Sequence, residues 1–234
     1  MEPVIIHYRF RFLDDQQVKD YIIKLDPESI TCAPPNTENK EDWTKLDFHQ
    51  CSDCPLKKED SEYCPIAVNL SDFVDYFKDE ISHKEAIVIV RANNRYYSKK
   101  LSLQEGLYSV YGLIMSTSNC PVMNFFKPMA RFHLPFASMD ETIFRTTSSY
   151  LLEQYYLAKK GHDADLKLDG LLARYKKVEK VNEGISSRLR AVTKGDADRN
   201  AVALLDTLAQ VLFFEMESSL ESMEYLFHDL TTKV

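Results

Sequence analysis

Apolar and polar residues alternate in the N-terminal segment "IIHYRFRF", residues 5–12. A period of two is typical of a β-strand that buries one face. After the turn-like "LDDQQ", the segment "DYIIKL" predicts a second strand and therefore a β-hairpin. Another hairpin is predicted in "EAIVIVRANNRYYSKKL", because Asn93 and Asn94 tolerate the positive φ of a tight turn. The apolar face of the first strand carries Ile6, Tyr8, Phe10 and Phe12.

From Ser102 onward the apolar positions follow the period of α-helices. Ser102 with Glu105, and Ser138 with Glu141, fit capping boxes and predict two helix starts. All nine prolines lie at or before Pro135, so no proline interrupts helical hydrogen bonding in the remainder of the chain. The second half of the protein is therefore predicted to be all-helical.

A seam of apolar residues, spaced three and four apart, lies near the C-terminus. It contains one polar position, Asn182, of the kind that can fix helix register. Gly195 and Asp196 predict a helix stop and a new N-cap, after which a final helix runs through Phe227. We expect an antiparallel helical hairpin over residues 165–230. The seam consists of Leu168, Leu171, Tyr175, Val178, Asn182, Ile185, Leu189 and Val192.

These patterns predict an α+β protein with two parts. Residues 1–101 form a mixed part with N-terminal β-hairpins and an irregular, cysteine-bearing loop at about 31–66. Residues 102–234 form a helical part that ends in the long antiparallel hairpin. A loop of that length inside a compact domain needs something to order it, and a bound metal would do so.

Composition narrows the class of protein. The 234 residues are 44% hydrophobic and 28% charged, as in ordinary globular proteins. The net charge of −7 argues against general binding to nucleic acids or membrane surfaces. No stretch approaches ~18 uninterrupted apolar residues, and no secretion signal is visible at the N-terminus. We therefore expect a cytoplasmic protein with reduced thiols, in which clustered cysteines favour metal binding over disulfides.

The segment "CSDCPLKKEDSEYCP" places Cys51, Cys54 and Cys64 within fifteen residues. A short Cys-x2-Cys pair plus distant ligands is how tetrahedral thiolate sites are built. Cys120 is the best fourth ligand, because it lies at a predicted helix break and is followed by proline, as are Cys54 and Cys64. Cys32 is followed by alanine and is left out. Since the four candidate ligands come from both parts, we expect one fused unit.

Either of two centres fits this ligand set. Structural zinc is the commonest partner of four cysteines, and zinc is placed slightly ahead. Cysteine followed by proline is also familiar among ligands of iron–sulfur clusters, so a [4Fe–4S] cluster is the rival. Residues 116–119, "STSN", could donate hydrogen bonds to cluster sulfides. His49 and His133 are reserve ligands if the site is mixed.

Arg131, His133 and Arg145 follow soon after Cys120 and are candidates for an anion-binding pocket. The alternative is that Arg131 and His133 pair with acidic groups of the cysteine loop and that Arg145 is solvated. His133 could also act as a general acid or base. No nucleophile at meaningful spacing accompanies it, so no catalytic residue is predicted.

The motifs "CSDCPL", "YCPIAVNL" and "MARFHLPFA" resemble those of a family of uncharacterised bacterial proteins. The resemblance covers roughly residues 45–230 and implies a bacterial cytosolic protein. It carries no assigned activity, so no functional residues follow from it.

Two functions are weighed. The first is a regulatory or protein-interaction module in which the four-cysteine metal site orders the loop and the helical hairpin docks a protein partner or a second copy. If the centre is iron–sulfur, such a module could sense redox state or gases. The second is an enzyme that binds an anionic substrate near Arg131, His133 and Arg145. Four thiolate ligands leave no open coordination position, so the module is preferred to the enzyme.

Overall fold

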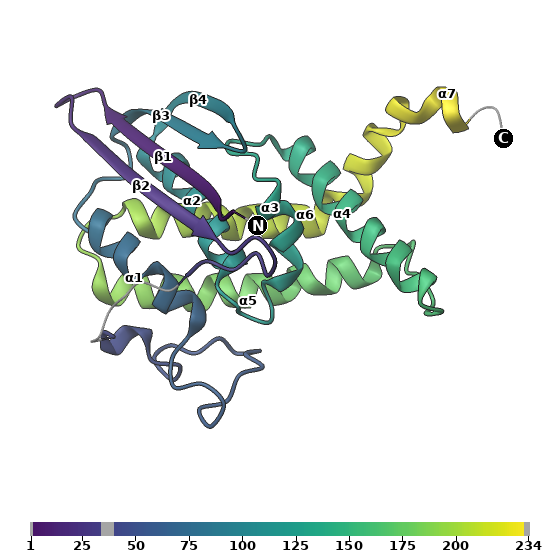
Figure 1. Cartoon of the computed structure of the whole chain (residues 1–234), viewed down its shortest axis with the longest axis horizontal. Helices are drawn as coiled ribbons and strands as arrows, with labels where there is room; N and C mark the ends of the chain where they lie inside the picture. Colours follow the sequence, from purple (N-terminus) through teal and green to yellow (C-terminus); the bar gives the residue numbers. More distant parts are fainter. Residues whose placement is uncertain (1, 34–39, 232–234) are drawn as a thin grey trace.

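The structure, a computed structural model, describes residues 2–33 and 40–231. An antiparallel sheet lies on one side of a group of helices, and two long helices run side by side along the molecule (Figure 1). This is the predicted α+β class, with the strands in the first part of the chain and a helical second part. One buried apolar cluster includes residues of both parts, from Val4 to Met223.

The sheet has the strand order β2-β1-β3-β4, and each neighbouring pair is antiparallel. Both predicted hairpins are present, and β1 and β3 join them edge to edge. Asn93 and Asn94 form the second turn with φ values of 49° and 61°, as their tolerance of positive φ predicted. The strands are β1 (Val4–Phe12), β2 (Val18–Leu25), β3 (Glu85–Ala92) and β4 (Arg95–Ser102).

One face of the sheet packs on α1 (Pro65–Phe77) and α2 (Leu103–Thr117). The four predicted apolar residues of β1 are all 0% exposed, so its alternation matches the burial. Helix α1 is not among the predicted elements. Its first turn overlaps the end of the loop predicted at 31–66, and Pro65 occupies a position where its missing N–H costs nothing.

The predicted helix starts in the middle of the chain are confirmed. Ser102 and Glu105 form a capping box at α2, and Ser138 and Glu141 form another at α4 (Met139–Lys159). The break between these helices contains the short helices η2 (Asn124–Phe126) and α3 (Lys127–Arg131).

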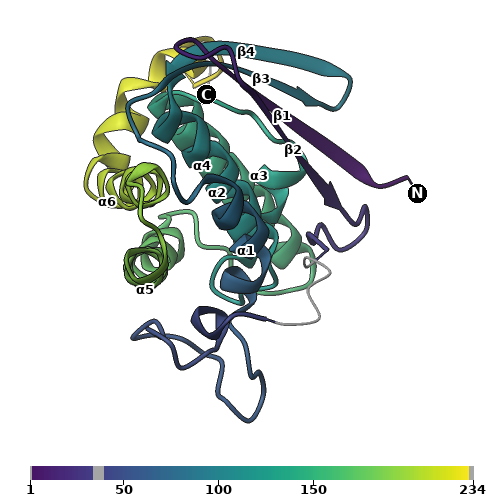
Figure 2. The same cartoon turned by 90° about the vertical axis from the view of Figure 1, so that its left-hand side faces the viewer.

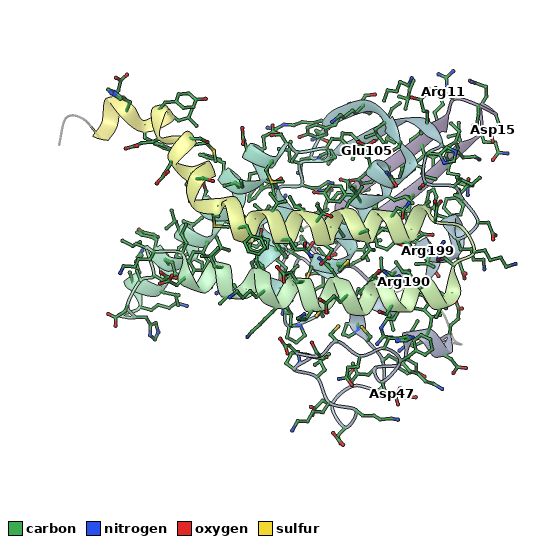
Figure 3. All side chains as sticks on the ribbon, turned by 180° about the vertical axis from the view of Figure 1, so that it is seen from behind. Arg11, Asp15, Asp47, Glu105, Arg190 and Arg199 are labelled. Atoms are coloured by element: carbon green, nitrogen blue, oxygen red, sulfur yellow. The ribbon has the colours of Figure 1, made fainter. Side chains whose placement is uncertain are left out.

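Helices α5 (Asp169–Val192) and α6 (Ala197–Ser222) form the expected hairpin and lie side by side (Figure 3). The seam of α5 is buried from Leu171 to Leu189, and it packs inside the chain. It is therefore not an open docking surface in this structure. Docking of a partner or second copy stays a prediction.

One detail of the predicted hairpin is wrong, and a second is confirmed only in position. The last helix does not run unbroken through Phe227, because α6 ends at Ser222 and is followed by η3 (Glu224–Phe227) and α7 (His228–Thr231). Asp196 stands at the N-cap position but makes no capping bond. Its carboxylate accepts hydrogen bonds from the amide and hydroxyl of Ser82, at 2.8 and 3.0 Å, so a tertiary contact replaces the local one.

The cysteine loop has little regular structure over its described residues, apart from η1 (Asp42–Thr44). Of the predicted loop, residues 34–39 lie outside the described residues. The loop folds back on itself, since the Cys64 amide donates to the Thr44 carbonyl at 2.8 Å and the Leu46 amide to the Glu62 carbonyl at 2.9 Å. The sheet and this loop lie on opposite sides of the helices (Figure 2). Within the described ranges, no helix is long and apolar enough to cross a membrane.

Candidate functional site

Four of the five cysteines are electrostatic neighbours, although they come from separate segments. Cys51 and Cys54 share a turn in which the Cys54 amide donates to the Cys51 carbonyl at 3.1 Å. Cys64 is the N-cap residue of α1, directly before Pro65. Cys120 follows the C-terminal end of α2 and is 8% exposed. The fold therefore gathers three thiols of the loop around one from the helical part.

The thiols influence one another's ionisation. The pKa of Cys51 is raised to about 12, first by burial and then by Cys64, Cys54 and Cys120, whereas the nearby charge of Arg188 lowers it. Burial likewise raises the pKa of Cys120 to about 11, with smaller contributions from Cys64 and Cys54. Cys51 and Cys120 are therefore neutral thiols at pH 7 in this structure. All the cysteines are free of disulfides.

Two backbone N–H groups lie near the sulfur of Cys120. The N–H groups of Val122 and Met123 lower the pKa of Cys120, because they hydrogen-bond to its charged form. Pro121 has no N–H, so the donors come from two and three residues beyond the cysteine. Amide donors around a ligand atom hold it in place and stabilise its charge. These donors would stabilise Cys120 as a thiolate ligand, and the Cys-Pro pair alone does not indicate this support.

The hydroxyls of three polar residues before Cys120 are engaged with the backbone. Those of Ser116 and Thr117 donate to the Leu113 carbonyl, and that of Ser118 donates to the Met115 carbonyl. These hydroxyls satisfy the last turn of α2, so donation from residues 116–119 to cluster sulfides stays a prediction.

Cys32 lies apart from the other cysteines. Its amide donates to the Thr117 carbonyl at 2.9 Å, and it forms an isolated bridge with Leu25 of β2. Its pKa is raised to about 11 by burial, with no contribution from another thiol. The structure thus provides a half-buried cysteine outside the candidate site, which can serve as a matched control.

Helix α5 lies directly against the cysteine loop, and Gly184 makes the close approach possible. A Cβ atom at position 184 would lie 2.7 Å from the sulfur of Cys51 and 3.4 Å from the His49 carbonyl. Contacts under 3.0 Å are not tolerated without displacement, so glycine is needed here for packing. The sequence offered no signal for this role, because Gly184 lies inside a regular helix.

Arg188, one turn further along α5, fastens the loop by hydrogen bonds. It is 1% exposed, and its guanidinium donates to three loop carbonyls. The charge is buried among acceptors, which is how an isolated cation can be accommodated in a protein interior. The acceptors are the carbonyls of Trp43 at 2.5 Å, Lys45 at 2.8 Å and Leu46 at 3.0 Å.

The thiols are neighbours without the spacing of metal ligands. Among the described residues, no group of three or more His, Cys, Asp or Glu side chains is arranged to hold a metal ion. A metal would have to draw the sulfurs together, and Cys51 and Cys54 lie in a turn outside the helices and strands. The metal centre predicted from the cysteines therefore stays a prediction.

The three residues of the predicted anion pocket are not equivalent. Arg131 is partly exposed and donates to the Asn93 side chain at 3.3 Å. His133 is enclosed by the fold, and its Nε2 lies 2.5 Å from the Tyr8 hydroxyl. Burial, together with the charge of Arg145, lowers the pKa of His133 to about 3, so its ring is neutral. Within the described residues neither Arg131 nor His133 forms an ion pair with the cysteine loop.

A groove of about 830 Å³ borders the thiol site. Pro55 and Pro121, which each follow a candidate ligand, form part of its wall. Leu152 and Tyr156 of α4 line it and are 53% and 56% exposed. Four basic residues and one acidic residue also line it, so the groove is locally positive in a protein of net charge −7. These residues are Lys127, Lys160, Arg174, Lys177 and Glu153.

Neither a curated protein nor a solved structure matches this chain. One protein family does match, over residues 6–228, and it is described as a domain of unknown function (DUF6901). The match covers nearly the whole chain, including both strands and helices and all four clustered cysteines. The chain therefore belongs to this family of domains of unknown function.

Proposed function

We propose that this protein is a regulatory or protein-interaction module in which Cys51, Cys54, Cys64 and Cys120 bind a zinc ion or a [4Fe–4S] cluster. The convergence of these four thiols from separate segments carries the proposal. Buried and half-buried thiols gathered without disulfides are the donor set that zinc and iron–sulfur clusters prefer. Cys32, half-buried elsewhere, is excluded from the set.

The ligand set favours a binding module over an enzyme. Four thiolates close the coordination sphere of a zinc ion, so the metal has no position for a substrate. Zinc would hold the loop against α5 as a structural centre. An iron–sulfur cluster would add sensitivity to redox state or gases, because loss of the cluster would release the loop.

Metal binding would couple to the shape of the loop. Neutral thiols must lose protons to become ligands, so binding replaces buried S–H groups with thiolates around a cation. Drawing the sulfurs together would move the Cys51–Cys54 turn, whose neighbour Pro55 lines the positive groove. A protein partner that binds the groove would then distinguish the metal-bound form of the protein from the metal-free form.

The experiment is anaerobic purification of the wild-type protein, Cys120→Ser and Cys32→Ser, followed by measurement of bound metal and sulfide. We expect wild type and Cys32→Ser to contain about one zinc ion, or iron and sulfide in the ratio of one cluster, per chain. Cys120→Ser should lose most of the bound metal, because serine removes one thiolate with little change of volume.

Circular dichroism of the three proteins provides the control for folding. Wild-type protein that binds neither zinc nor iron after anaerobic reconstitution would contradict the proposal. So would equal metal content in wild type and folded Cys120→Ser. Zinc content without iron would select the structural form, and iron with sulfide would select the sensing form.

A further inference from the structure

A second cavity lies on a different side of α5, away from the cysteine loop. It has a volume of about 140 Å³, is partly open to solvent, and is lined by residues of α2, α3, α4, α5 and α6. A protein cavity of about 150 Å³ accepts a benzene ring. Most of the wall is apolar, and it includes Phe126, Leu205, Leu208, Ala209 and Leu212.

The wall also carries polar groups that can donate hydrogen bonds to an occupant. Asn182 is 1% exposed, and its Nδ2 has no hydrogen-bond partner within the described residues. Burial raises the pKa of the neighbouring Asp206, and Asn182 partly offsets this rise, but neither the Asn182 Nδ2 nor the Asp206 Oδ1 has a hydrogen-bond partner within the described residues. The Tyr108 hydroxyl is neutral, because burial raises the pKa of Tyr108 to about 12. An occupant with acceptor atoms would satisfy these donors.

Arg145 adds a positive charge to the same wall. Its Nη2 donates to the carbonyls of Met129 at 3.0 Å and Phe132 at 2.9 Å. No acidic group in the described part of the chain lies within ion-pair distance of it. Glu141, the acid that acts on it electrostatically, is engaged in capping α4. Arg145 is half-buried and donates to neutral carbonyls, so its charge is only partly offset by Glu141 and stays available to an anionic occupant.

His133 does not compensate this charge. Its Nε2 and the Ser109 hydroxyl both pair with the Tyr8 hydroxyl, at 2.5 and 2.7 Å. The ring is neutral and lines the cavity, so it can hydrogen-bond an occupant without attracting or repelling charge. The net electrostatic preference of the cavity is set by Arg145.

We propose that this cavity binds a small apolar carboxylate, with its ring or short tail among the leucines of α6 and its carboxylate beside Arg145. The proposal is independent of the metal centre. The volume of the cavity fits a tail of about six carbon atoms, and the leucines favour an apolar tail. The guanidinium of Arg145 and the donors on the wall favour an anionic head that accepts hydrogen bonds. Arg131, which does not line the cavity, is not part of the site.

Benzoate is the probe, with benzamide as its neutral analogue and acetate as the head without a tail. Binding is measured by ligand-observed NMR and by the rise of Tm with ligand concentration. We expect saturable binding of benzoate, weaker binding of benzamide and none of acetate. Arg145→Gln should weaken benzoate binding by roughly tenfold to a hundredfold, the effect of losing a charged hydrogen bond. Arg131→Gln is the matched control and should bind as wild type does.

Ala209→Met tests the tail end of the cavity without touching the cation. Ala209 is 2% exposed and lines the cavity, so a longer side chain should fill the space and abolish binding. Ala203→Leu, on the exposed side of the same helix, should have no effect. If Arg145→Gln does not fold, Ala209→Met decides the question.

Three results would overturn the proposal. The first is wild-type protein that shows no saturable benzoate binding up to the solubility limit. The second is benzoate binding that is unchanged in folded Ala209→Met or Arg145→Gln, which would place the site elsewhere. The third is equal affinity for benzoate and benzamide, which would remove the role of the cation.

Discussion

Helix α5 lies between two regions that each take an arginine out of full contact with solvent, but the two arginines are paired differently. In the cysteine loop, Arg188 donates to three backbone carbonyls and is shut off from solvent. In the cavity, Arg145 donates to two carbonyls and still faces open space. The first arrangement uses the cation to hold the protein together. The second leaves charge and donors available for a ligand.

The geometry of α5 keeps these regions apart. Asn182 faces the cavity, whereas Gly184 faces Cys51. Residues two apart on a helix point about 200° away from each other, so neighbouring positions serve different sides. One helix therefore supports an irregular, thiol-bearing loop on one side and a helical cavity on the other. Substitutions on each side should have separable effects.

Arg188→Ala should have the largest effect on stability. The substitution leaves three loop carbonyls without their donor and opens a cavity, so we expect the free energy of unfolding to fall by about 3–5 kcal/mol. Urea denaturation measures the change, and limited proteolysis should show faster cleavage in the loop. Arg190→Ala, on the exposed side of the same helix (Figure 3), should change stability by less than about 0.5 kcal/mol. Equal effects of the two variants would contradict the fastening role of Arg188.

His133→Gln should change the pH dependence of stability. The pKa of His133 is about 3 in the folded protein, below its usual 6.5, so only the unfolded chain binds a proton at intermediate pH. The contribution of His133 to the free energy of unfolding is therefore lost as pH falls from 6.5 towards 3. We expect the variant to lose on the order of 2 kcal/mol less than wild type between about pH 6.5 and 4.5. The measurement is urea denaturation at a series of pH values, and parallel curves would show that His133 is not held neutral.

Gly184→Ala and Gly112→Ala should have effects of opposite sign. Alanine favours a helix over glycine by about 1 kcal/mol, but at position 184 its Cβ would lie 2.7 Å from the Cys51 sulfur. We expect Gly184→Ala to lower the free energy of unfolding by roughly 1 kcal/mol, because overpacking exceeds the helix preference. At position 112 the nearest atom to the new Cβ would belong to Leu205, 3.5 Å away. Gly112→Ala should therefore raise the free energy of unfolding, because the helix preference of alanine is not opposed by overpacking.

Thermal and urea denaturation of both glycine variants measure these changes. Stabilisation by both substitutions would mean that the loop yields easily at Cys51 and does not pack tightly on α5. That result would also weaken the expectation that the loop responds to a bound metal as a unit with α5.

Much of the fold could be predicted from local patterns. The alternation in β1, the Asn93-Asn94 turn and the two capping boxes depend on residues that lie near one another in sequence. Helix α1 was missed because it directly follows the irregular loop and its start signal, Cys64-Pro65, was interpreted as part of a metal motif. Asp196 occupies the predicted N-cap position but does not cap α6 with its side chain, because Ser82, which lies far away in sequence, hydrogen-bonds to its carboxylate.

The two candidate sites also differ in how far the sequence alone could predict them. Cysteine is rare and chemically distinctive, so the identity and spacing of Cys51, Cys54, Cys64 and Cys120 pointed to one cluster, and the fold makes them neighbours. Residues around the cavity carry no such mark, since Asn182 belongs to a regular heptad seam. Spacing grouped Arg131 with Arg145, but only Arg145 lines the cavity.

Residue types and their periods were enough to identify the elements, the α+β class and the thiols, because these depend on side-chain chemistry and short-range backbone geometry. Packing assigned Gly184 to a contact with Cys51, buried Arg188 among loop carbonyls and directed Arg145 to two neutral carbonyls. Such roles depend on which atoms, distant in sequence, pack against one another in the folded protein. That information arises when the chain becomes compact, since burial turns an ordinary glycine into a steric requirement and a surface-type cation into a binding group.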